Sequence, residues 1–133
     1  MAHLNVEALT AAAAGNAGAA YTLGIMYAKQ RMFGKAIEWL LKAAKANHIS
    51  AQLSLGIMYA EGRGVQQDYR EAMQWFRRAG KFNPYAQYNM GVMYANGHGA
   101  VQNIERAEKW FRRAASQNHL PAIEFLARIS LHR

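Results

Sequence analysis

One short segment occurs three times in this chain and sets the register of the rest. Leu-Gly-Ile-Met-Tyr stands at 23–27 and again at 55–59, and Met-Gly-Val-Met-Tyr stands at 90–94. A tryptophan follows each copy, and the three tryptophans, Trp39, Trp75 and Trp110, are 36 and 35 residues apart. A recurrence at this period is typical of a repeat protein, in which each repeat buries its apolar face against its neighbours.

The spacing within a repeat predicts two amphipathic helices. In the second repeat, small and apolar residues recur at i, i+4, i+7 and i+8 from Ala51, and at i, i+3, i+4 and i+7 from Ala72. A glycine recurs at one position of the first helix, although glycine inside a helix costs about 1 kcal/mol relative to alanine. We therefore expect close helix packing at Gly24, Gly56 and Gly91.

Glycines mark the turn between the two helices of a repeat. Gly-x-Gly stands at 62–64 and at 97–99, where we expect left-handed backbone conformations. Asp68 and Asn103 then occupy the positions expected for helix N-caps. The first repeat lacks the Gly-x-Gly and is four residues shorter here, which predicts a tighter hairpin.

The repeats divide the chain into three full copies and two flanking parts, all within one domain of residues 1–133. The predicted ranges are a capping helix at 4–14, repeats at about 17–46, 49–82 and 84–117, and a terminal half-repeat at 120–133.

With these residues placed, the chain resembles the Sel1-like repeat proteins, which are related to the tetratricopeptide repeats. The resemblance implies an all-α right-handed α/α superhelix, or solenoid, that works as a non-enzymatic adaptor and binds another protein or a peptide. Many secreted members carry a disulfide in each repeat, whereas this chain has no cysteine. The match is carried by residues 86–94, 97–99, Ala107 and 110–115, and in the second repeat by 62–65 and Asp68.

Composition excludes several classes of site. The absence of cysteine excludes disulfides, thiolate zinc sites and thiol catalysis. No stretch approaches the roughly 18 apolar residues that a membrane-spanning helix needs. The N-terminal residues lack Lys and Arg and include Glu7, which is a poor secretory signal. We therefore expect a cytoplasmic protein, or a periplasmic or secreted one if a signal peptide has been removed.

The net charge of +8 raises the question of an acidic partner. Lys42, Arg78 and Arg113 occupy equivalent positions and are predicted to form a basic row. Cations are favoured in the last turn of a helix by about 0.3–1 kcal/mol each, which favours a structural, solvated row. An acidic protein partner and nucleic acid are the two alternatives, and basic and aromatic residues are not interleaved as in a nucleic-acid site.

A binding face is predicted on the first helix of each repeat. The resemblance implies that these helices line the concave surface of the solenoid, which would suit an apolar or amphipathic peptide. An apolar ladder at helical spacing is more often part of a core than of a groove, so the structural interpretation stands beside the functional one. The predicted partner-binding residues are Tyr21, Ile25, Leu53, Ile57, Tyr85, Tyr88, Val92, Glu124 and Arg128.

The last predicted helix, at about 121–132, carries five apolar residues and has no partner helix after it. A patch of this kind marks an interface when it is exposed. Three interpretations stay open: a folded-back cap, a homodimer or partner contact, and one step of a longer array.

No catalytic, metal or cofactor motif is present. No histidine pair has metalloprotease spacing, and no serine stands in Gly-x-Ser-x-Gly. His48 and His119 are equivalent, and we expect each to cap or pack at a helix start. Glu38, Glu71 and Glu108 are interpreted as acidic members of helix-surface pairs. The function predicted is protein binding; the alternatives are a bacterial antitoxin-like immunity protein and a nucleic-acid-binding protein.

Overall fold

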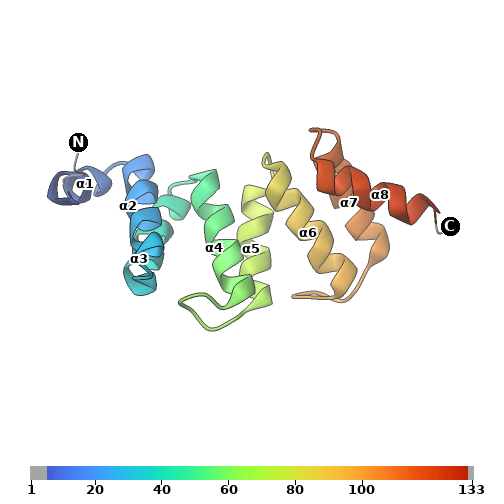
Figure 1. Cartoon of the computed structure of the whole chain (residues 1–133), viewed down its shortest axis with the longest axis horizontal. Coiled ribbons are helices and arrows are strands. Elements are labelled where there is room, and N and C mark those ends of the chain that lie inside the picture. Colours follow the sequence, from blue (N-terminus) through green and yellow to red (C-terminus); the bar gives the residue numbers. More distant parts are fainter. Residues whose placement is uncertain (1–5, 132–133) are drawn as a thin grey trace. The chain divides into compact units, whose positions relative to one another are not determined.

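The structure is a computed structural model, and it describes residues 6–131. This part of the chain forms eight α-helices and no strands (Figure 1). Residues 4 and 5 of the predicted capping helix and residues 132 and 133 of the predicted half-repeat lie outside the described range. The helices are α1 (Val6–Ala13), α2 (Ala17–Lys29), α3 (Phe33–Lys45), α4 (Ile49–Glu61), α5 (Tyr69–Ala79), α6 (Pro84–Asn96), α7 (Ile104–Ala115) and α8 (Leu120–Leu131).

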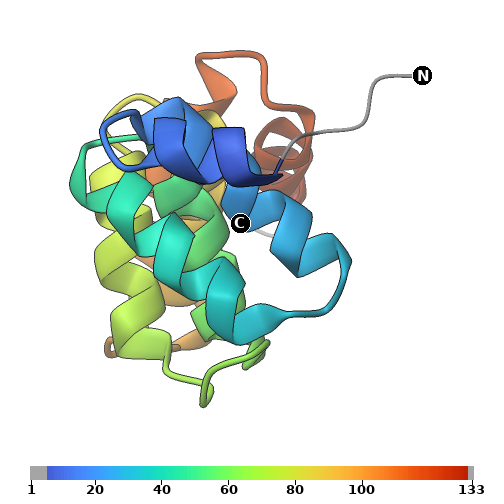
Figure 2. The same cartoon turned by 90° about the vertical axis from the view of Figure 1, so that its left-hand side faces the viewer.

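The contacts between residues divide the chain between Gln67 and Asp68 into two compact units. In the N-terminal unit, α1 packs on α2, α2 on α3 and α3 on α4; Figure 2 views this unit end-on. In the C-terminal unit, α5 packs on α6, α6 on α7 and α7 on α8. Within each unit, each helix therefore packs on the next one in sequence, as expected for a repeat protein whose contacts are between neighbours.

Two of the three recurring glycines, Gly24 and Gly91, lie against a buried side chain of the following helix. A Cβ atom at Gly24 would lie 2.8 Å from Cγ of Leu40, and one at Gly91 would lie 2.7 Å from Cε1 of Phe111. Leu40 and Phe111 are fully buried side chains on α3 and α7. The prediction of close packing at these two glycines is confirmed.

The predicted turns and caps are also confirmed. Gly62 and Gly97 follow α4 and α6 with φ of 69° and 72°. Asp68 accepts a hydrogen bond from a backbone N–H of α5 at 3.1 Å, and Asn103 accepts one from α7 at 3.0 Å. The shorter first hairpin turns instead through Arg31, which has a φ of 60°.

Two buried glutamines join consecutive helices at equivalent positions. Nε2 of Gln52 donates to the carbonyl oxygen of Ala44 at 3.1 Å, and Nε2 of Gln87 donates to that of Gly80 at 2.9 Å. Each bond adds a side-chain donor to a carbonyl oxygen at the C-terminal end of a helix, where the regular hydrogen bonds of the helix stop. The glutamines thus fix how α4 follows α3 and how α6 follows α5.

The expectation that Glu108 lies on a helix surface is wrong. Glu108 is 5% exposed, whereas Glu38 is exposed and Glu71 is half-buried. Its Oε2 accepts a hydrogen bond from the Arg112 guanidinium at 3.1 Å, so the expected ion pair exists but is partly buried. Glu108 follows Ala107 as the buried Met73 follows Ala72, which places it on the core side of its helix.

Candidate functional site

A cavity of about 550 Å³ opens in the N-terminal unit, between α2, α3, α4 and the loop that follows α4. Its wall contains apolar side chains from all three helices. Leu40 of α3 is fully buried, while Ile57 of α4 is 36% exposed. The lining residues are Ile25, Ala28, Lys29, Arg31, Phe33, Leu40, Ser54, Ile57, Met58 and Arg63.

The cavity brings together two of the four binding residues predicted in this unit. Ile25 and Ile57 line it, whereas Tyr21 and Leu53 do not. The Tyr21 ring instead stacks on the His48 ring, with 4.6 Å between ring centroids, and Tyr21 and Leu53 are both half-buried. A binding role for these residues stays a prediction.

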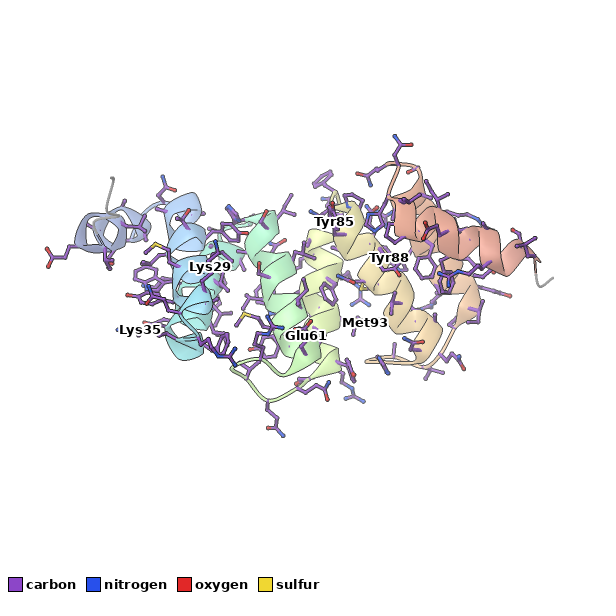
Figure 3. The ribbon with its side chains drawn as sticks, in the orientation of Figure 1. Lys29, Lys35, Glu61, Tyr85, Tyr88 and Met93 are labelled. Carbon is purple, nitrogen blue, oxygen red and sulfur yellow. The ribbon has the colours of Figure 1, made fainter. Side chains whose placement is uncertain are left out.

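Three cationic side chains also line the cavity. Lys29 ends α2, Arg31 lies in the first hairpin, and Arg63 follows α4. The Arg63 guanidinium forms an ion pair of 2.7 Å with Glu61, the last residue of α4. Figure 3 labels Lys29 and Glu61 on their helices. The site therefore combines an apolar wall with positive charge, which suits a ligand that has both apolar and acidic groups.

Sequence reasoning did not single out the cationic residues of this cavity, nor Phe33 or Leu40. One signal was available, because the first hairpin is shorter and differs from the other two. Arg31 directly follows the C-cap of α2 and adopts the left-handed conformation that Gly62 and Gly97 adopt after α4 and α6. A bulky residue in that conformation is uncommon and indicates a local requirement.

In the C-terminal unit, the predicted tyrosines surround a histidine. Tyr85 is 61% exposed and Tyr88 is half-buried, both near the start of α6 (Figure 3). Their ring centroids lie 4.9 and 5.2 Å from that of the buried His119. Tyr88 also contacts Phe111 at 5.4 Å, and Val92 is half-buried. Tyr88 is therefore largely part of a packed aromatic cluster, and Tyr85 is its exposed edge.

The two equivalent histidines have the structural roles predicted for them. His48 caps α4, since its Nδ1 accepts a hydrogen bond from the Ala51 N–H at 3.2 Å. His119 packs beneath Tyr85 and Tyr88, and burial lowers its pKa below the usual value because the charged form loses hydration. The ring contacts of His48 with Tyr21 and of His119 with Tyr85 and Tyr88 hold the start of α4 against α2 and the start of α8 against α6.

The last helix exposes both predicted polar residues and part of its apolar face. Glu124 and Arg128 are exposed, and the Arg128 guanidinium lies 6.0 Å from the centroid of the Phe125 ring. Leu120 and Ile123 of α8 are 61% and 41% exposed. A homodimer contact through α8 stays a prediction.

Each member of the predicted basic row lies over the tryptophan of its own helix. Nζ of Lys42 lies 4.4 Å from the Trp39 ring centroid. The guanidinium carbons of Arg78 and Arg113 lie 4.9 and 4.6 Å from the Trp75 and Trp110 rings. These cation–π contacts give the three charges a structural role in each repeat.

Within residues 6–131 no group of three or more His, Asp or Glu side chains is placed to hold a metal ion. In that same range no helix is both long enough and apolar enough to cross a membrane.

The sequence model described as Sel1 repeat matches residues 11–48, 49–81 and 84–119. The chain belongs to the Sel1 repeat family. Sel1 repeat proteins are in general protein-interaction modules built on a non-catalytic repeat scaffold. No curated protein matches the chain by sequence.

Solved structures support this assignment and the solenoid fold. A Sel1 repeat protein from Oxalobacter formigenes is 32% identical, with a TM-score of 0.84 over 93% of this chain and 98% of that one. The protective antigen c5321 of uropathogenic Escherichia coli, which displays an SLR fold, is 37% identical with a TM-score of 0.78. That match covers 86% of this chain and only 26% of the antigen.

Helicobacter pylori cysteine rich protein B has a TM-score of 0.68 over 91% of this chain and 96% of that one. At 24% identity this likeness shows the fold alone. The all-α solenoid class predicted from the repeats is confirmed by these neighbours.

Proposed function

We propose that this protein binds a peptide segment of a protein partner, and that the cavity of the N-terminal unit is the point of attachment. The observation that carries this proposal is the cavity itself, about 550 Å³, lined by Ile25 of α2 and Ile57 of α4. Its volume lies within the range of roughly 300–1,000 Å³ typical of ligand pockets. An apolar side chain of the partner entering it would be removed from water at roughly 25 cal/mol for each Å² buried.

The basic row supports protein binding over nucleic-acid binding. Lys42, Arg78 and Arg113 each lie within 5 Å of a tryptophan ring centroid, as their distances of 4.4, 4.9 and 4.6 Å show. A nucleic-acid site would instead combine exposed cations with exposed aromatic rings on which bases stack. We infer that the row stabilises the second helix of each repeat.

The proposal is tested by comparing two substitutions of the same kind. Ile57→Asp places a carboxylate in the cavity wall, whereas Val101→Asp places one at a side chain that is 88% exposed in a loop of the C-terminal unit. Both variants are first shown by circular dichroism and thermal unfolding to be folded. Immobilised wild-type protein and the Val101 variant are expected to retain the same partner from the source extract, and the Ile57 variant is expected to lose it.

Equal recovery of the partner by both folded variants would place the interaction outside the cavity. Loss with both variants would indicate a general effect of added negative charge, which would also contradict the assignment of the site.

A further inference from the structure

The cavity of the N-terminal unit has positive charge at its edge as well as an apolar wall, and the charged side chains come from two segments of the chain. Lys29 comes from the end of α2, Arg31 from the first hairpin and Arg63 from the loop after α4. We propose that the segment bound here has a large apolar side chain flanked by Asp or Glu. The apolar side chain fills the cavity, and the flanking carboxylates pair with Lys29 and Arg31. This inference rests on the proposed function and specifies the chemistry of the partner.

The ion pairs of the N-terminal unit leave two of these cations available. Arg63 is already paired with Glu61 at 2.7 Å. Lys29 and Arg31 form no ion pair with any residue in the described range 6–131. The positive charges of Lys29 and Arg31 repel each other when no anion is bound, and a bound carboxylate offsets this repulsion. Charge complementarity therefore favours a carboxylate-bearing segment at this point.

The backbone of Arg31 supports the same conclusion independently. Its φ of 60° lies in the left-handed region, where residues other than glycine are strained. The hairpins after α4 and α6 have glycine in this conformation, Gly62 and Gly97 with φ of 69° and 72°. Glycine at position 31 would therefore adopt the conformation of this turn with less strain than arginine does. Strain of this kind points to a use for the side chain rather than for the turn.

The neighbours of Arg31 hold it beside the cavity. Its guanidinium carbon lies 5.7 Å from the centroid of the Phe33 ring, and Phe33 itself lines the cavity. Gly64 packs against Phe33 so closely that a Cβ atom at position 64 would overlap the Phe33 side chain. The loop after α4 is thereby held against the start of α3. Arg31 and the loop that carries Arg63 therefore both pack against Phe33. These two cations are held beside the cavity before a ligand binds.

The experiment uses short synthetic peptides whose N-termini are acetylated and whose C-termini are amidated, so that only side chains supply carboxylates. A positional-scanning set of these peptides is presented to the wild-type protein, to Arg31→Gly and to Lys109→Gln. Lys109 is an exposed lysine of α7 in the C-terminal unit, so its substitution removes one positive charge without touching the cavity.

The wild-type protein and Lys109→Gln are expected to select peptides with an apolar residue between acidic ones. Arg31→Gly is expected to bind the selected peptides about tenfold more weakly, equivalent to roughly 1.4 kcal/mol. Its thermal stability should be equal to or higher than that of the wild type, because glycine relieves the left-handed strain. A loss of binding without a loss of stability separates a ligand contact from a structural role.

Three results would overturn the inference. In the first result, the selected peptides have no acidic residues, and Arg31→Gly binds them as well as the wild type does, whereas Ile57→Asp does not bind them. The cavity would then still bind a peptide, as the proposed function states, but the preference for acidic residues would be wrong. Binding of a mixed-sequence oligonucleotide that competes with the peptides and depends on Arg31 would assign the charge to nucleic acid. In the third result, the protein selects no peptide, which would contradict the proposal that an acidic segment binds in the cavity. The proposed function would then be tested separately, by whether Ile57→Asp still retains the protein partner.

Discussion

The first hairpin, α2–α3, and the third, α6–α7, join the same two kinds of helix by different turns. The first uses residues 30–32, and the third uses residues 97–103. In the third, glycine adopts the left-handed conformation at 97 and 99, and Asn103 caps the following helix. In the first, Arg31 adopts it, and Met32 before α3 makes no side-chain cap.

The helices that flank these turns pack alike. Gly24 lies against the buried Leu40 in the first hairpin, and Gly91 lies against the buried Phe111 in the third. A cation covers the tryptophan of the second helix in both, Lys42 in one and Arg113 in the other. The comparison shows that the two repeats keep the same helix packing although their turns differ. The sequence of a turn can therefore differ between repeats without changing how the helices pack.

The largest effect is expected at a glycine of the third hairpin. Gly99 has a φ of 80°, and a Cβ atom there would lie 2.7 Å from the carbonyl oxygen of Tyr69. Gly99→Ala should lower the free energy of unfolding by about 2–4 kcal/mol, because left-handed strain and overpacking both act. Urea unfolding followed by circular dichroism measures it.

Gly97→Ala is the control for that prediction. Its φ is 72°, but a Cβ atom would approach no atom closer than 3.3 Å, at Gln102. It should cost about 1–2 kcal/mol from strain alone. If both alanine variants were as stable as the wild type, the third hairpin would not depend on its glycines as the structure indicates.

Arg31→Gly should have the opposite sign. Removing the left-handed strain of Arg31 gains about 1–2 kcal/mol. The greater backbone entropy of glycine in the unfolded chain offsets about 0.5–1 kcal/mol of this gain. Loss of the contact between the Arg31 guanidinium and the Phe33 ring offsets about 0.5 kcal/mol more. A net gain of up to about 0.5 kcal/mol is expected in the same urea measurement. A clear decrease would mean that the Arg31 side chain stabilises the first hairpin, and the argument from strain would fail.

A smaller loss is expected when the tryptophans lose their cations. Lys42→Gln and Arg113→Gln should each lower the free energy of unfolding by about 0.5 kcal/mol, the value for an exposed cation–π contact. Lys109→Gln removes the same charge from an exposed position and should leave stability unchanged. Equal effects of Arg113→Gln and Lys109→Gln would show that net charge, rather than contact with Trp110, is responsible.

The smallest effect concerns pH and the histidine that follows the third hairpin. Burial lowers the pKa of His119 below 6.5, so the unfolded chain binds the proton at higher pH than the folded chain does. Stability should therefore fall as the pH drops through 6.5 toward the folded-state pKa. His119→Gln should reduce this dependence when urea midpoints are compared above and below that pH. An unchanged slope would place the titrating group elsewhere.

The repeated positions made most of the architecture predictable. The Gly-x-Gly turns and the Asp68 and Asn103 caps depend on local geometry, so residue type and spacing are enough to identify them. The packing glycines were identifiable because a glycine recurs at the same helical position of each repeat. The fate of Glu108 was not predictable in this way. Its burial depends on which side of α7 faces the preceding helix, and a polar residue at a core position looks like a surface residue in the sequence.

The candidate site shows the same division. Ile25 and Ile57 could be proposed from their places in the repeat, since both follow the packing glycine by one residue. Lys29, Arg31 and Arg63 could not, because they meet only when the short first hairpin and the loop after α4 close on the same cavity. The sequence shows that the first hairpin is shorter than the other two, but it does not show that this hairpin places cations beside a cavity.

The sequence by itself determined that this chain is a series of helix pairs, that Gly-x-Gly turns and the Asp68 and Asn103 caps separate helices, and that small residues recur where helices pack. Turns and caps are local properties, and the recurrence in several repeats identifies the packing positions. Only the tertiary structure decided that Tyr88 and His119 share a packed cluster, and that cations from the first hairpin and from the loop after α4 border one apolar cavity. Those outcomes depend on distances between side chains far apart in the chain, which the packing of the helices sets.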